Sequence, residues 1–167
     1  STLEAIYFFL VCKNGVPLGY GPAGVACGAC EMGINLFPEF RGAEIRFVWA
    51  QIMRVLHHVL GADYFFLQPY GMGVGNPEAI QSGAFWFYRK LGFLAESPAI
   101  EALAQAEERR MAKDPRYRSD RGTLHRLKHT RAYLDLSGGR HRWLDLGALA
   151  LGVTDLVRRR YRGDRAR

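Results

Sequence analysis

The chain has 167 residues, of which 49% are hydrophobic and 23% charged, as in ordinary globular proteins. This length suffices for one domain with a buried core, and the composition excludes a disordered, collagen-like or low-complexity chain. The longest apolar stretch, 143–157, contains Asp145 and Asp155 and is too short to cross a bilayer, so we expect no membrane span. Three cysteines, an odd number, argue against a disulfide framework and favour a reducing compartment, by default the cytoplasm.

The net charge of +7 is distributed unevenly along the chain. Residues 1–97 contain 6 basic and 7 acidic residues, whereas residues 98–167 contain 17 basic and 9 acidic residues. All 10 phenylalanines lie in the first of these segments. The composition therefore predicts a near-neutral, aromatic-rich core over 1–97, followed by a basic, mainly helical extension over 98–167.

The first 40 residues are expected to form three strands. The apolar run Ala5–Lys13 is followed by Asn14-Gly15, the dipeptide most typical of a two-residue hairpin turn, and then by a strand from Val16 to about Cys27. Glycines and a proline within this second strand mark a bulge, an edge or a close approach of backbones. Alternating apolar residues predict a third strand, Cys30–Phe37.

The pattern after residue 40 alternates helices and strands. Apolar residues at helical spacing predict a helix over Ala43–Leu60, and the aromatic run Asp63–Pro69 predicts a buried strand. A glycine-rich loop over 71–75 precedes a helix that begins at Asn76-Pro77-Glu78 and ends at Arg89-Lys90-Leu91-Gly92. Further helices are expected over 100–112, 121–129 and 143–161, with a short strand over 132–136. We therefore expect an α/β (α+β) fold in which an antiparallel meander leads into a βαβ-like unit, with a C-terminal helical extension.

Two stretches carry a resemblance to a known family. Phe37–Gly42 (FPEFRG) is similar to the strand end and pyrophosphate loop, Q/R-x-x-G-x-G/A, of the GNAT superfamily of acyl-CoA-dependent N-acyltransferases. Phe87–Phe93 (FYRKLGF) is similar to the family's second signature, a helix ending in Tyr-x-Lys-Leu-Gly-Phe. The resemblance covers Glu31–Phe93, and the family's opening strand and two helices have no counterpart ahead of Ala5. It implies a GNAT-like mixed sheet that binds acyl-CoA, such as acetyl-CoA, and transfers the acyl group to an amine.

The resemblance also implies a set of cofactor contacts. In the family, backbone N–H groups at a helix start face the cofactor's phosphates, and glycines allow the close approach. On that pattern Arg41 takes the first position, whereas Glu44 and Arg46 occupy the two glycine positions, which brings a carboxylate and bulk towards a diphosphate. Gln81 stands where the family commonly has Asn. The implied cofactor-binding residues are Leu36, Arg41, Gly42, Ala43, Ile45, Arg46 and Gln81.

Two residues are candidates for proton transfer. Tyr88 matches the tyrosine that often serves the family as general acid towards the CoA thiolate, although it is also one of several aromatic residues in a core helix. Glu31 is the candidate general base, but counting back from Arg41 puts Cys30 at the family's position. On a regular strand Glu31 would face the other side, unless a bulge intervenes. Two hypotheses therefore stay open: an active acyltransferase with an unknown amine substrate, or an inactive GNAT-fold scaffold that binds a protein partner.

The remaining motifs indicate weaker hypotheses. The Cys27–Cys30 C-x-x-C has no second such motif to complete four zinc ligands, and a two-residue turn explains its spacing, so we expect no metal site. His125 and His129 lie four apart within a basic run, as on a solvated helix face. The arginine-rich C-terminus permits nucleic-acid binding, but favourable cations at a helix end and a frayed tail are the preferred explanation. The sequence does not indicate an oligomeric state.

Overall fold

The computed structural model describes residues 5–40, 42, 44–140 and 145–164. Its strands are β1 (Ala5–Lys13), β2 (Val16–Ala26), β3 (Ala29–Met32), β4 (Asn35–Leu36), β5 (Tyr64–Leu67), β6 (Leu94–Ala95) and β7 (Ala132–Asp135). Its helices are α1 (Ile45–Leu60), α2 (Pro69–Met72), α3 (Pro77–Gln81), α4 (Ala84–Arg89), α5 (Pro98–Lys113), α6 (Arg121–Leu127) and α7 (Leu146–Tyr161), with a 3-10 turn at Pro38–Phe40.

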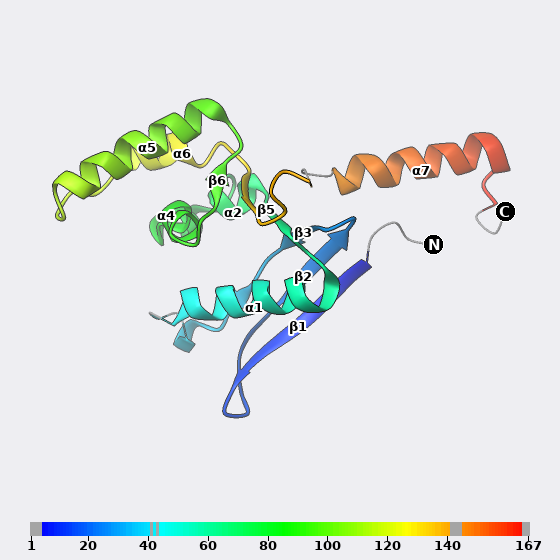
Figure 1. Cartoon of the computed structure of the whole chain (residues 1–167), viewed down its shortest axis with the longest axis horizontal. Coiled ribbons are helices and arrows are strands. Elements are labelled where there is room, and N and C mark those ends of the chain that lie inside the picture. The colour runs from blue at the N-terminus through cyan, green and yellow to red at the C-terminus, as the bar shows by residue number, and fades with distance from the viewer. Residues whose placement is uncertain (1–4, 41, 43, 141–144, 165–167) are drawn as a thin grey trace.

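The strands form one mixed sheet in the order β1-β2-β3-β5-β7-β6, and β4 pairs with β2 beyond the end of β3. β1, β2 and β3 are antiparallel, β5 runs parallel to β3 after the crossover through α1, and β7 is antiparallel to β5 and β6. The predicted mixed sheet, with an antiparallel meander and a βαβ-like unit, is confirmed (Figure 1). The 98–167 segment contributes β7, which lies inside the sheet between β5 and β6.

Helix α1 covers one face of the sheet (Figure 1). Its apolar stripe buries Trp49, Met53 and Leu56 in one core cluster with Cys30 of β3 and Phe65 of β5. The helix ends at Gly61, whose left-handed backbone (φ 66°) lets its N–H close the last turn on the His57 and Leu56 carbonyls. The helix predicted from apolar spacing is thus present, and α4 packs beside it in the same cluster.

Both tight turns of the meander have the same geometry. Asn14 and Gly15 have φ values of 51° and 79°, and Cys27 and Gly28 have φ values of 48° and 79°, as in the mirror-image turns that two-residue hairpins prefer. Cys27 is therefore a turn residue, whereas Cys30 is buried on β3, where burial and then the nearby Glu31 raise the pKa of its thiol to about 12. Among the described residues no group of three or more His, Cys, Asp or Glu side chains could hold a metal ion.

The single strand predicted over Cys30–Phe37 is interrupted at Gly33. β3 and β4 keep one register against β2, with Ala23 opposite Met32 and Tyr20 opposite Asn35, so no bulge separates them. The ladder breaks because Pro22 accepts the Gly33 N–H (3.1 Å) but has no N–H of its own to return the bond.

Three further expectations differ from the structure. The helix expected from Asn76 to Gly92 is two helices, because Gly83 takes a left-handed backbone (φ 70°) between α3 and α4. The loop expected over 71–75 begins with the short helix α2, which starts at Pro69 and ends at Gly73 (φ 119°). The two-residue strand β6 was not predicted, since so short a run has no periodicity.

The close approach of Gly21 in β2 to Gly33, between β3 and β4, predicts that adding one methyl group at Gly21 strongly destabilises the fold. A Cβ on Gly21 would overlap the Gly33 carbonyl oxygen, a backbone atom that cannot move aside without shifting the strand. We therefore expect Gly21→Ala to lower the free energy of unfolding by about 3 kcal/mol, the upper range for overpacking. Gly33→Ala is the matched control, because a Cβ there has nothing within 4 Å. Urea denaturation of both variants measures the difference, and equal losses would contradict the expectation.

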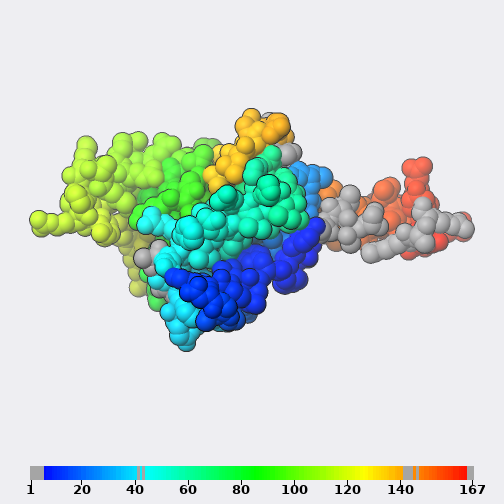
Figure 2. Space-filling view, turned by 60° about the horizontal axis from the view of Figure 1, so that its bottom comes forward, coloured from blue at the N-terminus to red at the C-terminus, as the bar shows by residue number. Residues whose placement is uncertain are grey.

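Helix α7 projects from the rest of the molecule (Figures 1 and 2). Asp145 caps it by accepting the Ala148 N–H (2.8 Å), and its exposed apolar residues include Leu151 and Leu156. The start predicted for this helix, at 143–144, lies outside the described residues. None of the described helices is long and apolar enough to cross a membrane.

Candidate active site

The sheet opens between β4 and β5. β3 and β5 are paired only at Ala29 with Tyr64, Cys30 with Phe65 and Glu31 with Phe66. Beyond this point the chain of β3 continues into β4, which pairs with β2 alone. The split therefore begins just after Glu31, and the loop that precedes α1 follows at the end of β4.

Glu31 lies at the start of this split, on the sheet face opposite α1. Side chains alternate along a strand, so Glu31 shares a face with Ala29 and Phe66, away from the buried Cys30. Its half-buried carboxylate accepts a hydrogen bond from the Gln68 side-chain amide, with Nε2 to Oε2 at 3.2 Å. Because the register contains no bulge at this point, Glu31 stays on the face that its strand position predicts.

An open cleft of about 460 Å³ adjoins Glu31 through Gln68. Gln68 lines this cleft together with residues of the loop after β6 and of the loop between α6 and β7, including Ser97, Thr130 and the ion pair of Arg131 with Glu96 (2.6 Å). The cleft's polar wall offers carboxylate, hydroxyl and imidazole groups to a small polar molecule. The Glu31 carboxylate is thus one hydrogen bond away from a space that an amine can enter.

Tyr88 lies on the other side of the sheet, in α4. Its ring packs edge-on against Trp49 of α1 (centroids 5.2 Å apart) and against Phe93 (5.9 Å). Burial raises the pKa of its phenol to about 12. Tyr88 is therefore a core residue on the α1 face of the sheet, packed against the cluster that contains Cys30 and Phe65.

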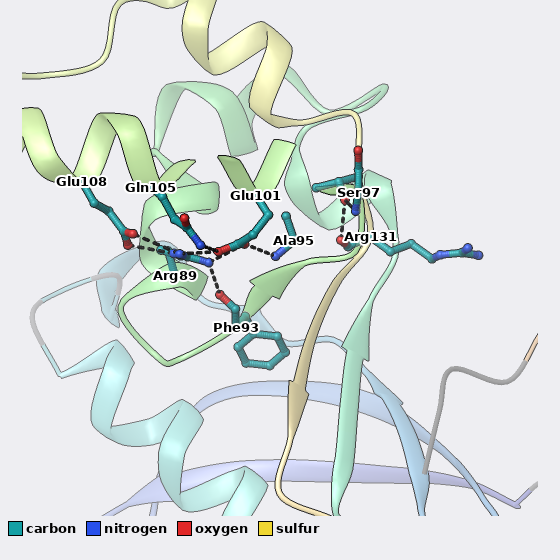
Figure 3. A network of polar contacts seen from close by, with 9 residues as sticks. Arg89, Phe93, Ala95, Ser97, Glu101, Gln105, Glu108 and Arg131 are labelled. Carbon is teal, nitrogen blue, oxygen red and sulfur yellow. Dashed lines mark hydrogen bonds and ion pairs between the residues drawn. The ribbon is translucent and has the colours of Figure 1, made fainter. Parts of the chain in front are cut away.

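A network of ion pairs anchors the helix that carries Tyr88 (Figure 3). Arg89, whose side chain is 10% exposed, donates to both oxygens of Glu101 (2.7 and 2.8 Å) and to both oxygens of Glu108 (2.8 and 3.0 Å). Glu101 also accepts the Ala95 N–H (2.9 Å) of β6. The network joins α4, β6 and α5, and so it fixes where α4 places its aromatic residues.

The loop at the start of α1 differs from an open phosphate cradle. The Gly42 N–H already donates to the Phe40 carbonyl (3.0 Å), and the Ile45 N–H donates to the Gly42 carbonyl (3.2 Å). The Glu44 carboxylate is bound by Lys13 of the β1–β2 hairpin, with Nζ at 2.7 and 2.9 Å from its oxygens. Arg46 is exposed in the first turn of α1. Arg41 and Ala43, the other implied loop residues, lie outside the described residues.

The last two implied cofactor residues lie apart from each other. Leu36 is in β4, opposite Gly19, where a Cβ on Gly19 would meet the Leu36 Cα at 2.9 Å. Gln81 ends α3 and lines a different cleft, between α3 and α6, that no residue of β4, β5 or α1 lines. The structure thus brings Glu31 and Leu36 to the split but turns Gln81 towards α6.

Sequence reasoning missed Gln68, Lys13 and the polar cleft. Alternation along β5 places Gln68 on the face of Phe66, and this signal was present, but its meaning depends on the pairing of β5 with β3. Lys13 ends the first strand at the hairpin, and no local pattern connects it with Glu44, 31 residues later. The cleft residues come from three separate segments, so only the folded chain unites them.

Comparison of the sequence with models of protein families gives no match. Comparison with curated proteins gives none either. Among solved structures, a chimera of the Vibrio cholerae spermidine N-acetyltransferase SpeG and hSSAT is 17% identical with a TM-score of 0.49, over 80% of this chain and 71% of that chain. The Campylobacter jejuni N-acetyltransferase PseH is 15% identical with a TM-score of 0.47, over 79% of this chain and 69% of that chain.

A third solved structure, the Vibrio cholerae spermidine N-acetyltransferase in complex with CoA and spermine, is 19% identical with a TM-score of 0.43, over 56% of this chain and 53% of that chain. All three are N-acetyltransferases, the class of enzyme that the sequence motifs resemble. At TM-scores below 0.5, function has to be argued from the chain's own residues.

Proposed function

We propose that this chain is a GNAT-like N-acyltransferase domain that transfers an acyl group from acyl-CoA to an amine across the split between β4 and β5. One observation carries the proposal: Glu31, held by Gln68, stands where β3 and β5 separate, and the helix that carries Tyr88 packs in the core on the opposite face of the sheet. The FYRKLGF signature spans the end of α4 and the turn before β6, and the strand-to-helix loop connects β4 with α1. The fold alone does not decide function, so the proposal rests on these residues.

The residues fit the acyl end of the cofactor better than its phosphate end. β4 and β5 diverge beside apolar residues such as Leu67, which suits a thioester and its acyl chain. At the phosphate end Arg46 and Lys13 supply cations, and the first N–H groups of α1 have no partner within the helix. The negative charge of Glu44 repels a phosphate, however, and Lys13 neutralises this charge only while the Lys13–Glu44 ion pair is formed.

In the proposed reaction, acyl-CoA supplies an activated thioester carbonyl. Glu31 accepts the proton that the amine must lose, directly or through water, and Gln68 holds the carboxylate in place. The amine approaches from the cleft that Gln68 and Glu96 line. Tyr88 donates a hydrogen bond towards the departing sulfur. The new bond is C–N, the broken bond is C–S, and the amine's proton leaves with the thiol or to solvent.

The first test is a thermal shift with acetyl-CoA and longer acyl-CoAs. We expect Glu44→Gly/Arg46→Gly to bind more tightly than the wild type. The change removes a carboxylate and bulk from the helix start and releases Lys13 from its ion pair, which compensates the loss of the Arg46 cation. Ligand at 100 times its Kd stabilises the folded state by about 2.7 kcal/mol, which raises Tm by roughly 5–11 °C in a domain of this size. Glu39→Gln, in the neighbouring 3-10 turn, is the matched control.

The hydrogen bonds within the loop at the start of α1 favour a second candidate, a GNAT-fold scaffold that no longer binds CoA. Its basis is the bidentate Lys13–Glu44 pair together with the Gly42 N–H that is already hydrogen-bonded. A shift in the double variant alone would support this scaffold. The absence of a shift in both proteins would refute acyl-CoA binding and with it the acyltransferase.

A further inference from the structure

A second cleft, of about 590 Å³, lies between α3 and α6, and no acidic residue lines it. Clefts of this size hold small-molecule ligands. The side chains that matter are the basic residues Arg121, His125 and Lys128, the apolar residues Ile80 and Leu124, and the amide of Asn76. Neither the split in the sheet nor helix α1 contributes to this cleft.

The three basic residues form a row along one face of α6 and its C-cap residue, Lys128. Their spacing of four and then three positions places them one above another on the helix. None of the three forms an ion pair with any residue that the structure describes. Lys128 is half-buried, and its Cβ lies 3.6 Å from the point that a Cβ on Gly73 would occupy, so its aliphatic stem is packed at the rim of the cleft. Two permanent cations and one imidazole thus face a common space.

The rest of the cleft is apolar or donates hydrogen bonds. Ile80 and Leu124 supply apolar surface from opposite walls. Asn76 caps α3 by accepting the Ala79 N–H at 3.1 Å, which fixes its amide and leaves the NH2 group to donate. Arginine and lysine are the side chains that bind phosphate oxygens, and an apolar wall accepts a planar base. This combination suits a ligand with a phosphate at one end and a base at the other.

We propose that the cleft between α3 and α6 binds a phosphate-bearing small molecule of the nucleotide class, at a site distinct from the acyl-CoA site. The proposal does not depend on the acyltransferase activity, because Glu31, Gln68 and Tyr88 do not line this cleft. A nucleotide is favoured over a nucleic acid strand because the cations face a cleft rather than an open surface.

The test is binding of ADP and of inorganic pyrophosphate to the full chain by isothermal titration calorimetry. We expect ADP to bind more tightly than pyrophosphate, since only ADP can use the apolar wall. Lys128→Met, which keeps the aliphatic stem, and Arg121→Gln should each weaken ADP binding at least tenfold, about 1.4 kcal/mol. Arg126→Gln is the matched control, because Arg126 is exposed on α6 outside the cleft and carries the same charge.

Three results would overturn the proposal: no saturable binding of ADP at millimolar concentration, an equal loss in Arg126→Gln, or a loss of acetyl-CoA binding in the cleft variants that matches the loss of ADP binding. The last result would assign the cleft to acyl-CoA instead. Circular dichroism checks that each variant folds, and His125→Gln provides a second test if Lys128→Met does not. Failure of the acyltransferase proposal would leave the ADP result unchanged, so the two proposals can be judged separately.

Discussion

Replacing Arg89 with alanine is expected to lower the free energy of unfolding by about 3 kcal/mol, the lower end of the range for breaking a buried ion pair. The Arg89 side chain is 10% exposed and binds Glu101 and Glu108, which are 19% and 42% exposed. Its loss leaves two carboxylates side by side, and water compensates Glu108 better than Glu101. Differential scanning calorimetry should show a Tm lower by roughly 6–12 °C.

The pH dependence of stability distinguishes loss of this ion pair from loss of packing as the cause of the destabilisation in Arg89→Ala. Burial acts to raise the pKa of Glu101, but hydrogen bonds from Arg89, the Ala95 N–H and Gln105, together with the charge of Arg89, outweigh burial and lower it. A lowered folded-state pKa stabilises the fold above the unfolded pKa, and this stabilisation is lost as pH falls through the folded value. The stability difference between the wild type and Arg89→Ala should therefore be largest near pH 7 and smaller at pH 3.

Two variants complete this experiment. Arg158→Ala removes an exposed arginine that pairs with Asp155 in α7, and we expect it to change the free energy of unfolding by less than about 0.5 kcal/mol. Adding Glu101→Gln to Arg89→Ala removes the stranded charge and should restore part of the loss. A Tm of Arg89→Ala within 2 °C of the wild type, equal to that of Arg158→Ala, would mean that the network does not hold α4 in place.

Local sequence patterns predicted those turns and helices that depend only on residues close together in the sequence. Asn14-Gly15 encodes its turn because glycine adopts a positive φ without strain, and the apolar spacing of α1 encodes the face that it buries. The breaks were harder to foresee. Pro22 interrupts β3 and β4 only because it lies opposite Gly33, and that pairing is not visible in either segment alone.

The candidate site was predicted in part, for the same reason. The position of Glu31 on its strand gave its face, since alternation is a local property. Its neighbour Gln68 could not be inferred, because it follows a parallel strand that pairs with β3 through long-range contacts. The ion pair of Glu44 could not be inferred either, because its partner Lys13 lies in the hairpin, far away in the sequence. Arg89 lies within the FYRKLGF signature, but its ion pair joins α4 to Glu101 of α5, a partner that the signature does not reveal.

Replacing Glu31 with glutamine is expected to lower kcat by about 10²–10³-fold in an assay of CoA thiol release with acetyl-CoA and a panel of primary amines. The change keeps the size of the side chain and an oxygen that can accept from Gln68, but it removes the proton acceptor. The defect should shrink as pH rises towards 10, because an alkylamine with a pKa of about 10.4 then supplies more of its free base without help. KM for acetyl-CoA should change little.

Tyr88→Phe gives the comparison that identifies the proton-transfer residue. Burial raises the pKa of Tyr88 to about 12, so its phenol is a weaker acid than a thiol with a pKa of about 8.5, and full proton transfer from it to sulfur is unfavourable. The ring contacts with Trp49 survive in phenylalanine, so we expect a loss of tenfold or less and no change in folding. If Tyr88→Phe abolishes activity while Glu31→Gln keeps it at every pH, the roles assigned to these two residues are wrong, and the proton must leave the amine by another group in the cleft that Gln68 lines.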